Sequence, residues 1–132
     1  MKIYYAWSIR GWRDDRDLYL QIIQYMKQYG TVLTEHIADP DLNFDISDKE
    51  IFTADRGWLE ESDVIVSDIS QNSIGVWYEL WFGESLWKPI LCLFRDQEWK
   101  RPSAMVSGND LITLEIYKTL DEAKVILDNF LA

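Results

Sequence analysis

Short apolar runs alternate with longer segments of helical periodicity along the whole chain. The runs expected to be strands are Lys2–Ala6, Thr31–Glu35, Asp63–Ile69, Pro89–Phe94 and a weaker one near Leu111–Ile116. The segments expected to be helices are Asp14–Tyr29, Lys49–Ser62, Ile74–Trp87 and Leu120–Leu131. Strands that alternate with helices are joined by right-handed crossovers, which produce a parallel sheet covered on both faces. The pattern predicts an α/β fold, a single Rossmann-like or flavodoxin-like domain over residues 1–132 with a five-stranded parallel sheet flanked by helices. Ligands of such sheets bind beyond the carboxyl ends of the strands.

The charge balance limits the classes of partner. A net charge of −10 disfavours a surface for nucleic acid or for an anionic membrane, so neither partner is expected. An anionic small molecule would need a local basic niche, and Arg10, Arg13 and Arg16 supply one near the N-terminus.

The single cysteine and the single histidine bear on the cellular compartment of the protein and on whether it binds a metal or other cofactor. The lone cysteine, Cys92, lies in an apolar run, which is typical of a buried thiol in a reducing compartment. No secretory signal and no stretch of 18 apolar residues is seen, so we expect a cytoplasmic location. With one histidine, one cysteine and no carboxylates at ligand spacing, no metal or other cofactor is expected.

The segment after the first strand is a candidate phosphate site, and it reads Trp7-Ser8-Ile9-Arg10-Gly11-Trp12-Arg13. Backbone N–H groups at the start of a helix, a serine hydroxyl and two arginines can together bind a phosphate. A solvated turn with surface arginines accounts for the same residues about equally well, so the segment alone leaves both interpretations open.

Two acidic residues are candidates for chemistry. Glu79 stands in the apolar stretch Ser73–Leu80 and its continuation, where an ionised carboxylate is costly unless it has partners or a function. Asp55 stands early in the second expected helix or just before it. Taken singly, Glu79 could face solvent and Asp55 could complement the helix dipole. Two carboxylates that converge at the strand ends are the pair that glycosidic-bond chemistry needs, one as nucleophile and one as acid.

Five stretches, in order and covering nearly the whole chain, resemble the 2′-deoxynucleoside 5′-phosphate N-hydrolases of the nucleoside 2-deoxyribosyltransferase superfamily. They are Ile3-Tyr4-Tyr5-Ala6-x-Ser8-Ile9-Arg10-Gly11-x-Arg13-Asp14-Asp15, Val32-Leu33-Thr34-Glu35-His36, Ser73-x-Gly75-Val76-x-Tyr78-Glu79-Leu80, Lys88-Pro89-Ile90-Leu91-Cys92-Leu93-Phe94-Arg95 and Ser103-Ala104-Met105. The resemblance implies a homodimer that hydrolyses the N-glycosidic bond of deoxynucleoside monophosphates to a free base and 2-deoxyribose 5-phosphate.

The resemblance also implies roles for individual residues. Glu79 would be the nucleophile on C1′ and form a covalent deoxyribosyl intermediate, and Tyr4 would hold its carboxylate in place. Asp55 would protonate the leaving base and then help water to resolve the intermediate. The residues implied to line the sugar-phosphate site are Ser8, Ile9, Arg10, Gly11 and Ser73. Ser103 would reach the phosphate of the neighbouring subunit, with Met105 close to the base.

Tryptophan is the main departure from the family pattern. The family has glycine where this chain has Trp7, Trp12, Trp77, Trp81, Trp87 and Trp99, whereas Trp58 matches a family tryptophan. The two residues share almost no physical role, so we interpret these positions as TGA codons that the native host reads as glycine. Where indoles are present, we expect Trp7 to crowd the phosphate loop and Trp77 and Trp81 to flank Glu79. Large residues at glycine positions cost about 1–3 kcal/mol each when they overpack, so several should lie at the surface, in a dimer interface or in the empty pocket.

Three functions therefore remain open for the sequence. The first is a deoxynucleotide N-hydrolase, which Ser103 and the arginine-bearing loop favour. The second is a nucleoside deoxyribosyltransferase, which would use the same carboxylates and pass the sugar to a second base. The third is a catalytically silent nucleotide-binding protein whose pocket is closed by Trp7 and Trp77.

Overall fold

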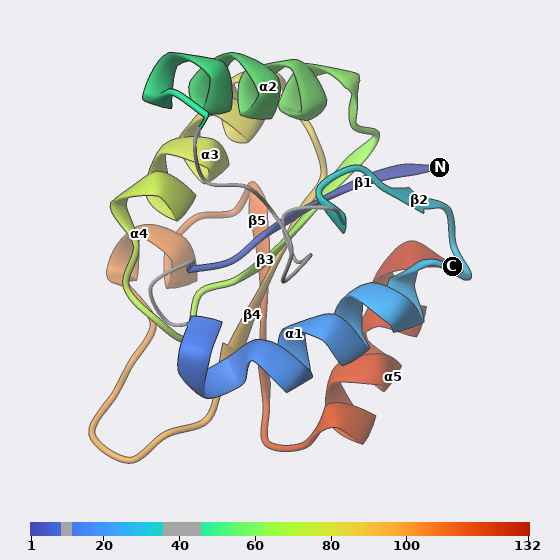
Figure 1. The fold of residues 1–132 in the computed structure, drawn as a ribbon. Helices are drawn as coiled ribbons and strands as arrows, with labels where there is room; N and C mark the ends of the chain where they lie inside the picture. The colour runs from blue at the N-terminus through green and yellow to red at the C-terminus, as the bar shows by residue number, and fades with distance from the viewer. Residues whose placement is uncertain (9–11, 36–45) are drawn as a thin grey trace.

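The chain forms one five-stranded sheet in which all neighbouring strands are parallel, in the order β2-β1-β3-β4-β5. The computed structural model describes residues 1–8, 12–35 and 46–132, with only the backbone for residues 12–14. The strands are β1 (Lys2–Ala6), β2 (Thr31–Val32), β3 (Val64–Asp68), β4 (Ile90–Arg95) and β5 (Ile112–Tyr117). The helices are α1 (Trp12–Met26), α2 (Asp48–Glu61), α3 (Ile74–Ser85), α4 (Ala104–Ser107) and α5 (Leu120–Leu131). The α/β prediction with a five-stranded parallel sheet is confirmed (Figure 1).

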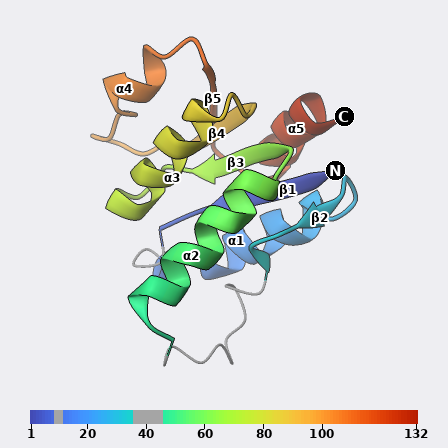
Figure 2. The same cartoon turned by 90° about the horizontal axis from the view of Figure 1, so that it is seen from above.

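Helices cover both faces of the sheet. Helices α1 and α5 pack on one face and α2, α3 and α4 on the other (Figures 1 and 2). Each face has its own apolar core, and neighbouring residues of a strand belong to different cores because side chains alternate along a strand. Tyr4 of β1 therefore packs under α2 and α3, and Tyr5 packs under α1 and α5. This alternation separates the polar groups of the two faces.

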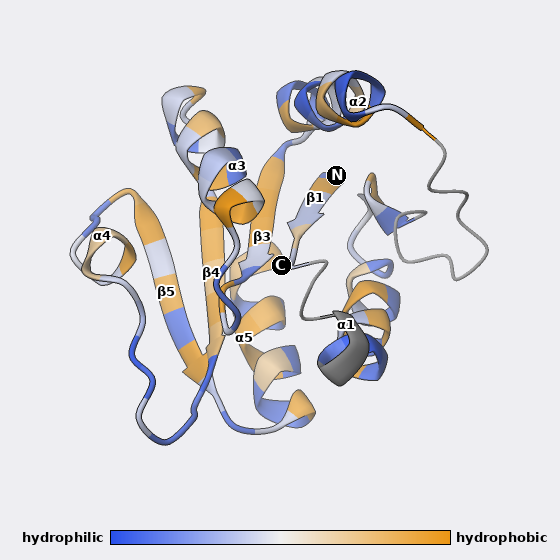
Figure 3. Ribbon diagram, turned by 60° about the vertical axis from the view of Figure 1, so that its left-hand side comes forward, coloured by the Kyte–Doolittle hydropathy of each residue, from blue (hydrophilic) through white to orange (hydrophobic). Residues whose placement is uncertain are grey.

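Hydropathy follows the same layers. The buried strand β4 is apolar up to its last residue, Arg95, and β3 begins with the apolar run Val64-Ile65-Val66, while the polar residues lie mainly on the helices and loops (Figure 3). Such strands are typical of a parallel sheet that is covered on both faces. Within the described residues, no helix has both the length and the apolar character required to cross a membrane.

Two elements differ from their expected bounds for identifiable reasons. Strand β2 has two residues instead of five, because the side chain of Thr34 replaces the next step of the ladder. The Thr34 Oγ1 accepts a hydrogen bond from Tyr5 N at 3.1 Å and donates one to Tyr5 O at 2.8 Å. Helix α1 starts two residues early and changes direction at Asp15, which has φ −120° and ψ 16°. The short helix α4 was not expected from the sequence.

Trp87 and Trp99 have left-handed backbone conformations, with φ of 57° and 68°. Trp87 follows α3, where its N–H bonds to Glu84 O at 2.9 Å and the next N–H, of Lys88, bonds to Gly83 O at 3.1 Å. This pair of bonds is the Schellman motif, in which glycine is the usual left-handed residue. Trp99 is the third residue of a turn closed by a bond from Lys100 N to Gln97 O at 3.3 Å. A turn in which only the third residue has a positive φ is a type II turn, and its third position also favours glycine.

Among the described residues, these two tryptophans are the only ones other than glycine with a positive φ, and no described glycine has one. Both side chains extend into solvent. The backbone at these two positions is therefore of the kind that glycine adopts without strain, in agreement with the glycine expected there.

Candidate active site

Glu79 lies in the middle of α3, whose start and position on the sheet are both determined locally. The Oγ of Ser73 accepts a hydrogen bond from Val76 N at 3.3 Å and caps the helix. Gly83 allows α3 to lie close to the sheet, because a Cβ at that position would stand 2.1 Å from Cδ1 of Ile65. The carboxylate of Glu79 is thereby brought against the carboxyl end of the sheet.

Three elements bring the predicted catalytic residues together. Tyr4 of β1 is almost completely buried, and its hydroxyl donates a hydrogen bond to the carboxylate of Glu79. Asp55 lies on α2, half-buried, and is close enough for its charge to affect Glu79. The structure therefore places Tyr4, Asp55 and Glu79 in one cluster, and their catalytic roles stay predictions.

Burial controls the ionisation of this cluster. The pKa of Glu79 is raised to about 8, mainly by burial and also by the negative charge of Asp55, while the Tyr4 hydroxyl acts to lower it. Burial also raises the pKa of Asp55 to about 6. The pKa of Tyr4 is raised far above its ordinary value by burial and by both carboxylates, so its hydroxyl keeps its proton. Between these two pKa values the carboxylate pair holds one proton, which lies mainly on Glu79, the group with the higher pKa. Attack by Glu79 with Asp55 as the acid therefore uses the less populated of the two arrangements of that proton.

Two cavities meet at Glu79. One of about 490 Å³ is bordered by Ser8 and Ser73, and one of about 470 Å³ is bordered by Asp55. Ile74, Gly75 and Glu79 border both of them. A molecule that fills one cavity and extends into the other would therefore pass over the Glu79 carboxylate.

The residues predicted to bind substrate are divided among three places. Ser8 and Ser73 border the first cavity, as a sugar-phosphate site beside Glu79 would require. The predicted contacts Ile9, Arg10 and Gly11 lie outside the described residues.

Ser103 and Met105 lie in and beside α4, and neither is among the residues that border the two cavities of the same chain. The Oγ of Ser103 accepts a hydrogen bond from Met105 N at 3.2 Å at the start of this helix. The side chain of Met105 is 79% exposed. A contribution of either residue to an active site therefore depends on a second subunit, which remains a prediction.

The tryptophans near Glu79 differ in their surroundings. Trp7 is buried, stacks on Tyr5 with ring centroids 5.1 Å apart, and borders the first cavity. Trp77 is half-buried and borders the same cavity. Trp81 is 63% exposed and borders neither cavity, so the expectation that it flanks Glu79 is wrong. Trp81 lies on the outer side of α3, whereas its neighbour Phe82 packs in the core.

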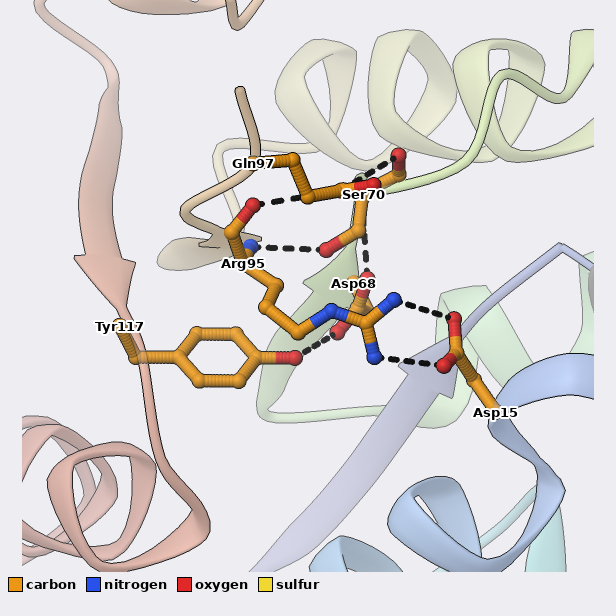
Figure 4. A network of polar contacts seen from close by, with 6 residues as sticks. All are labelled: Asp15, Asp68, Ser70, Arg95, Gln97 and Tyr117. Carbon is orange, nitrogen blue, oxygen red and sulfur yellow. Dashed lines mark hydrogen bonds and ion pairs between the residues drawn. The ribbon is translucent and has the colours of Figure 1, made fainter. Parts of the chain in front are cut away.

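A second acidic cluster, which the sequence analysis missed, lies on the α1–α5 face (Figure 4). Asp68, at the end of β3, accepts hydrogen bonds from the Tyr117 hydroxyl at 2.7 Å and from Ser70 N at 2.9 Å. Arg95 donates two hydrogen bonds to Asp15, at 2.5 and 3.0 Å. An aspartate at the end of a fully buried strand was the available sequence signal, but its partners come from distant parts of the chain.

The cluster at Glu79 combines a half-buried carboxylate, a proton donor and an adjoining cavity. Among the described residues, no three histidine, cysteine, aspartate or glutamate side chains are grouped so that they could hold a metal ion. What the described groups can do directly is attack an electrophilic carbon with one carboxylate and transfer a proton with the other.

Comparison with known sequences gives a consistent set of similarities. A family model described as nucleoside 2-deoxyribosyltransferase matches residues 3–114. A 5-hydroxymethyl-dUMP N-hydrolase of Rattus norvegicus is 44% identical over 111 residues, which are 80% of this chain and 68% of that protein. A 5-hydroxymethyl-dUMP N-hydrolase of Esox lucius is 41% identical over 139 residues, which are 98% of this chain and 95% of that protein.

Solved structures show the same fold at low sequence identity. A CMP N-glycosidase of Clostridium botulinum superposes with a TM-score of 0.71 at 15% identity, covering 98% of this chain and 100% of that one. A 2-deoxyribosyltransferase of Bacillus psychrosaccharolyticus superposes with a TM-score of 0.63 at 16% identity, covering 94% and 90%. At these identities, the likeness concerns the fold alone.

Proposed function

This chain belongs to the nucleoside 2-deoxyribosyltransferase family, and we propose that it hydrolyses the N-glycosidic bond of 2′-deoxynucleoside 5′-monophosphates. The products are a free base and 2-deoxyribose 5-phosphate. Relatives that are 41% and 44% identical carry the name 5-hydroxymethyl-dUMP N-hydrolase, and their named substrate is a deoxynucleoside monophosphate.

The observation that carries the proposal is the arrangement of Glu79, Asp55 and Tyr4. Two carboxylates with pKa values of about 8 and about 6 share a proton near neutral pH, beside cavities that meet at Glu79. Glycoside cleavage needs one carboxylate as nucleophile and one carboxylic acid as proton donor.

In the first step, an oxygen of the Glu79 carboxylate forms a bond to C1′ while the bond from C1′ to the base nitrogen breaks. The electron pair of that bond leaves with the base, which takes the proton of Asp55. The hydrogen bond from Tyr4 holds the Glu79 carboxylate and favours its ionised form. A 2-deoxyribosyl cation forms readily because no 2′-hydroxyl withdraws electrons from C1′, so little further stabilisation is required.

In the second step, the Asp55 carboxylate takes a proton from water. The resulting hydroxide oxygen bonds to C1′, and Glu79 leaves as a free carboxylate, which restores the starting state. A deoxyribosyltransferase would follow the same path with a second base in place of water, so the two reactions differ in the acceptor.

The phosphate end of the substrate is assigned to the cavity bordered by Ser8 and Ser73. Ser8 lies at the end of β1 and Ser73 at the start of α3, where backbone N–H groups favour an anion. We further propose a homodimer in which Ser103 of the partner subunit completes this site, with the partner's Met105 near the base. Their location away from both cavities of the same chain supports this arrangement.

A cytoplasmic location is part of the proposal. It is supported by Cys92, a free and fully buried thiol, which is typical of a protein in a reducing compartment.

The positions of Trp7 and Trp77 favour one alternative, a nucleotide-binding protein without turnover. Both residues border the cavity assigned to the sugar phosphate, where an indole takes space that glycine would leave open. A blocked cavity would bind substrate weakly and hold it away from Glu79.

The decisive assay compares the chain as written with a variant that has glycine at the six family positions. Each protein is incubated with a deoxynucleoside monophosphate, or with a deoxynucleoside plus a free acceptor base, and the products are separated. The N-hydrolase proposal expects free base and 2-deoxyribose 5-phosphate from the monophosphate, with faster release by the glycine variant. Exchange of bases without net hydrolysis would support the transferase, and thermal stabilisation by nucleotide without products from either protein would support the silent alternative.

A further inference from the structure

Arg95 contacts helix α1 and the segment that leads to the cavity of Ser8 and Ser73. Its guanidinium donates to both carboxylate oxygens of Asp15, at the bend of α1. Its backbone N–H donates to Ser70 Oγ at 2.8 Å, in the segment that connects β3 to α3. Figure 4 shows Arg95 lying between these two partners.

The segment that contains Ser70 leads directly into the cavity wall. Asn72 and Ser73 border the cavity two and three residues after Ser70. Asp15 belongs to the first turns of α1, which follows Ser8 after the short segment of residues 9–11. The side chain of Gln97 adds a hydrogen bond to Ser70 O at 3.5 Å on the same side. Arg95 therefore holds α1 through its side chain and the segment before Ser73 through its backbone, at the point where β4 ends.

The contact between Arg95 and Asp15 depends on the opposite charges of the two side chains. Asp15 is 7% exposed and Asp68 is 1% exposed, and Arg95 is the described cation that contacts Asp15 and whose charge acts on Asp68. A bidentate arginine–carboxylate pair has a defined geometry that a single lysine contact lacks. Asp15 is at the residue where α1 departs from helical geometry, so this pair also holds the direction of the first turn.

We propose that Arg95 and Asp15 are a positioning pair that sets the width of the phosphate end of the cavity, without touching the substrate. This inference rests on the proposed function for the identity of the ligand. It makes a specific claim about selectivity: the pair matters for the 5′-phosphate and much less for the nucleoside part of the substrate.

The test compares Arg95→Gln, Asp15→Asn, the double variant and the control Lys118→Gln. Lys118 forms an exposed ion pair with Asp96 at 3.9 Å beyond the end of β5, so it controls for the loss of a cation at the same edge of the sheet. For each protein, kcat and KM are measured with a deoxynucleoside monophosphate and with the corresponding deoxynucleoside, together with the melting temperature. Inorganic phosphate serves as a second probe, by its effect on the melting temperature.

We expect each single variant to raise KM for the monophosphate about 10-fold, with less than a twofold change for the nucleoside, because a misplaced wall weakens only the contacts made there. The double variant removes both members of the ion pair and should recover part of the melting temperature lost in the single variants, because neither member is left without its charged partner, while Asp68 still loses the nearby charge of Arg95. Its KM for the monophosphate should stay raised. The control should behave like the unmodified protein.

Equal losses with both substrates, or a KM that recovers together with the melting temperature in the double variant, would overturn the positioning role and leave a purely structural pair. Absence of turnover both in the unmodified protein and in the variant with glycine at the six family positions would refute the proposed function instead. In that case the inference is decided by inorganic phosphate: it stands if phosphate stabilises the unmodified protein and not the variants, and it fails if all respond alike.

Discussion

The two acidic clusters lie on opposite faces of one sheet and differ in how their charges are balanced. On the α1–α5 face, Asp15 and Asp68 have Arg95, Tyr117 and Ser70 as hydrogen-bonding partners. On the other face, burial raises the pKa values of both Glu79 and Asp55, the charge of Asp55 also raises that of Glu79 and the Tyr4 hydroxyl lowers it, and none of these influences is a cation.

This difference in charge balance indicates that the cluster of Asp15 and Asp68 stabilises the fold, whereas the cluster of Glu79 and Asp55 is suited to chemistry. A buried carboxylate with a bidentate arginine is held in one position, which suits a structural connection. A buried carboxylate without a cation is costly to ionise and remains reactive toward carbon and protons. Substitutions that remove charge should therefore have opposite effects on stability at the two clusters.

The largest expected effect is on turnover, from Glu79→Gln. We expect base release to fall by at least about 10⁴-fold, because the neutral amide cannot attack C1′. Glu84→Gln is the matched control, since Glu84 lies on the same helix and accepts a hydrogen bond from Asn109 at 2.6 Å that an amide oxygen can also accept. The rates follow from chromatography of the released base.

The next effect concerns Asp55→Asn and the pH profile. For the unmodified protein, kcat/KM should be bell-shaped with limbs near pH 6 and pH 8, because the reactive form holds one proton on the Glu79–Asp55 pair. In Asp55→Asn, the alkaline limb should disappear and the rate should fall by about 10²–10³-fold, since the acid is missing. A variant that keeps the alkaline limb would show that another group supplies the proton.

Loss of the Tyr4 hydroxyl should change the same profile by a smaller amount. The hydrogen bond from Tyr4 lowers the pKa of Glu79, so Tyr4→Phe should move ionisation of Glu79 to higher pH and reduce kcat at pH 7 by about 10-fold. Ser85→Ala, elsewhere on α3, is a control for a lost hydroxyl, since its Oγ bonds only to Phe82 O in the described structure. An unchanged limb in Tyr4→Phe would contradict the proposed support of the carboxylate.

Stability should respond in opposite directions at the two clusters. The folded pKa of Glu79 is about 8 against an ordinary 4.5, so its contribution to stability is complete below pH 4.5 and is lost as pH rises through 8. Glu79→Gln should therefore stabilise the protein by about 2–4 kcal/mol at pH 8.5 and have little effect at pH 4. Asp15→Asn should destabilise it by about 1–3 kcal/mol at neutral pH, because Arg95 loses its charged partner. Urea denaturation at the two pH values measures both, and destabilisation by Glu79→Gln at pH 8.5 would refute the contrast.

The smallest effect is expected at the two left-handed tryptophans. Trp87→Gly and Trp99→Gly should each stabilise the protein by about 1 kcal/mol, because glycine adopts a positive φ without a Cβ clash and little buried surface is lost. Trp58→Gly, which removes a half-buried side chain that packs against the core, should destabilise it. In protein isolated from the native host, mass spectrometry of the peptides that contain residues 87 and 99 should find glycine, and an indole there would refute the decoding interpretation.

Much of the fold followed from local patterns. Alternation of apolar runs and amphipathic segments identified all five strands and the four long helices, because each element buries one face. The two-residue β2 was not predictable, since its end depends on Thr34 reaching Tyr5 across 29 residues. The left-handed positions of Trp87 and Trp99 were suggested only by the family pattern, because tryptophan itself gives no such local signal.

The site was predictable to a similar degree. Glu79 stood out as a carboxylate in an apolar helix, and the resemblance to the family paired it with Asp55, which the structure places in the middle of α2. The second cluster was not identifiable, because Arg95 and Asp15 are 80 residues apart and Tyr117 and Asp68 are 49 residues apart. Such pairings arise from the packing of whole elements, and no local pattern encodes them.

The central claim is that Glu79 forms a covalent bond to the sugar. It is tested most directly by rapid acid quenching of the protein, as written and with glycine at the six family positions, during turnover of a deoxynucleoside monophosphate. Proteolysis and mass spectrometry should find a 2-deoxyribosyl 5-phosphate group on the peptide that contains Glu79, and no such group in Glu79→Gln. Release of the base at an undiminished rate by Glu79→Gln, or the sugar attached to a different carboxylate, would contradict the account.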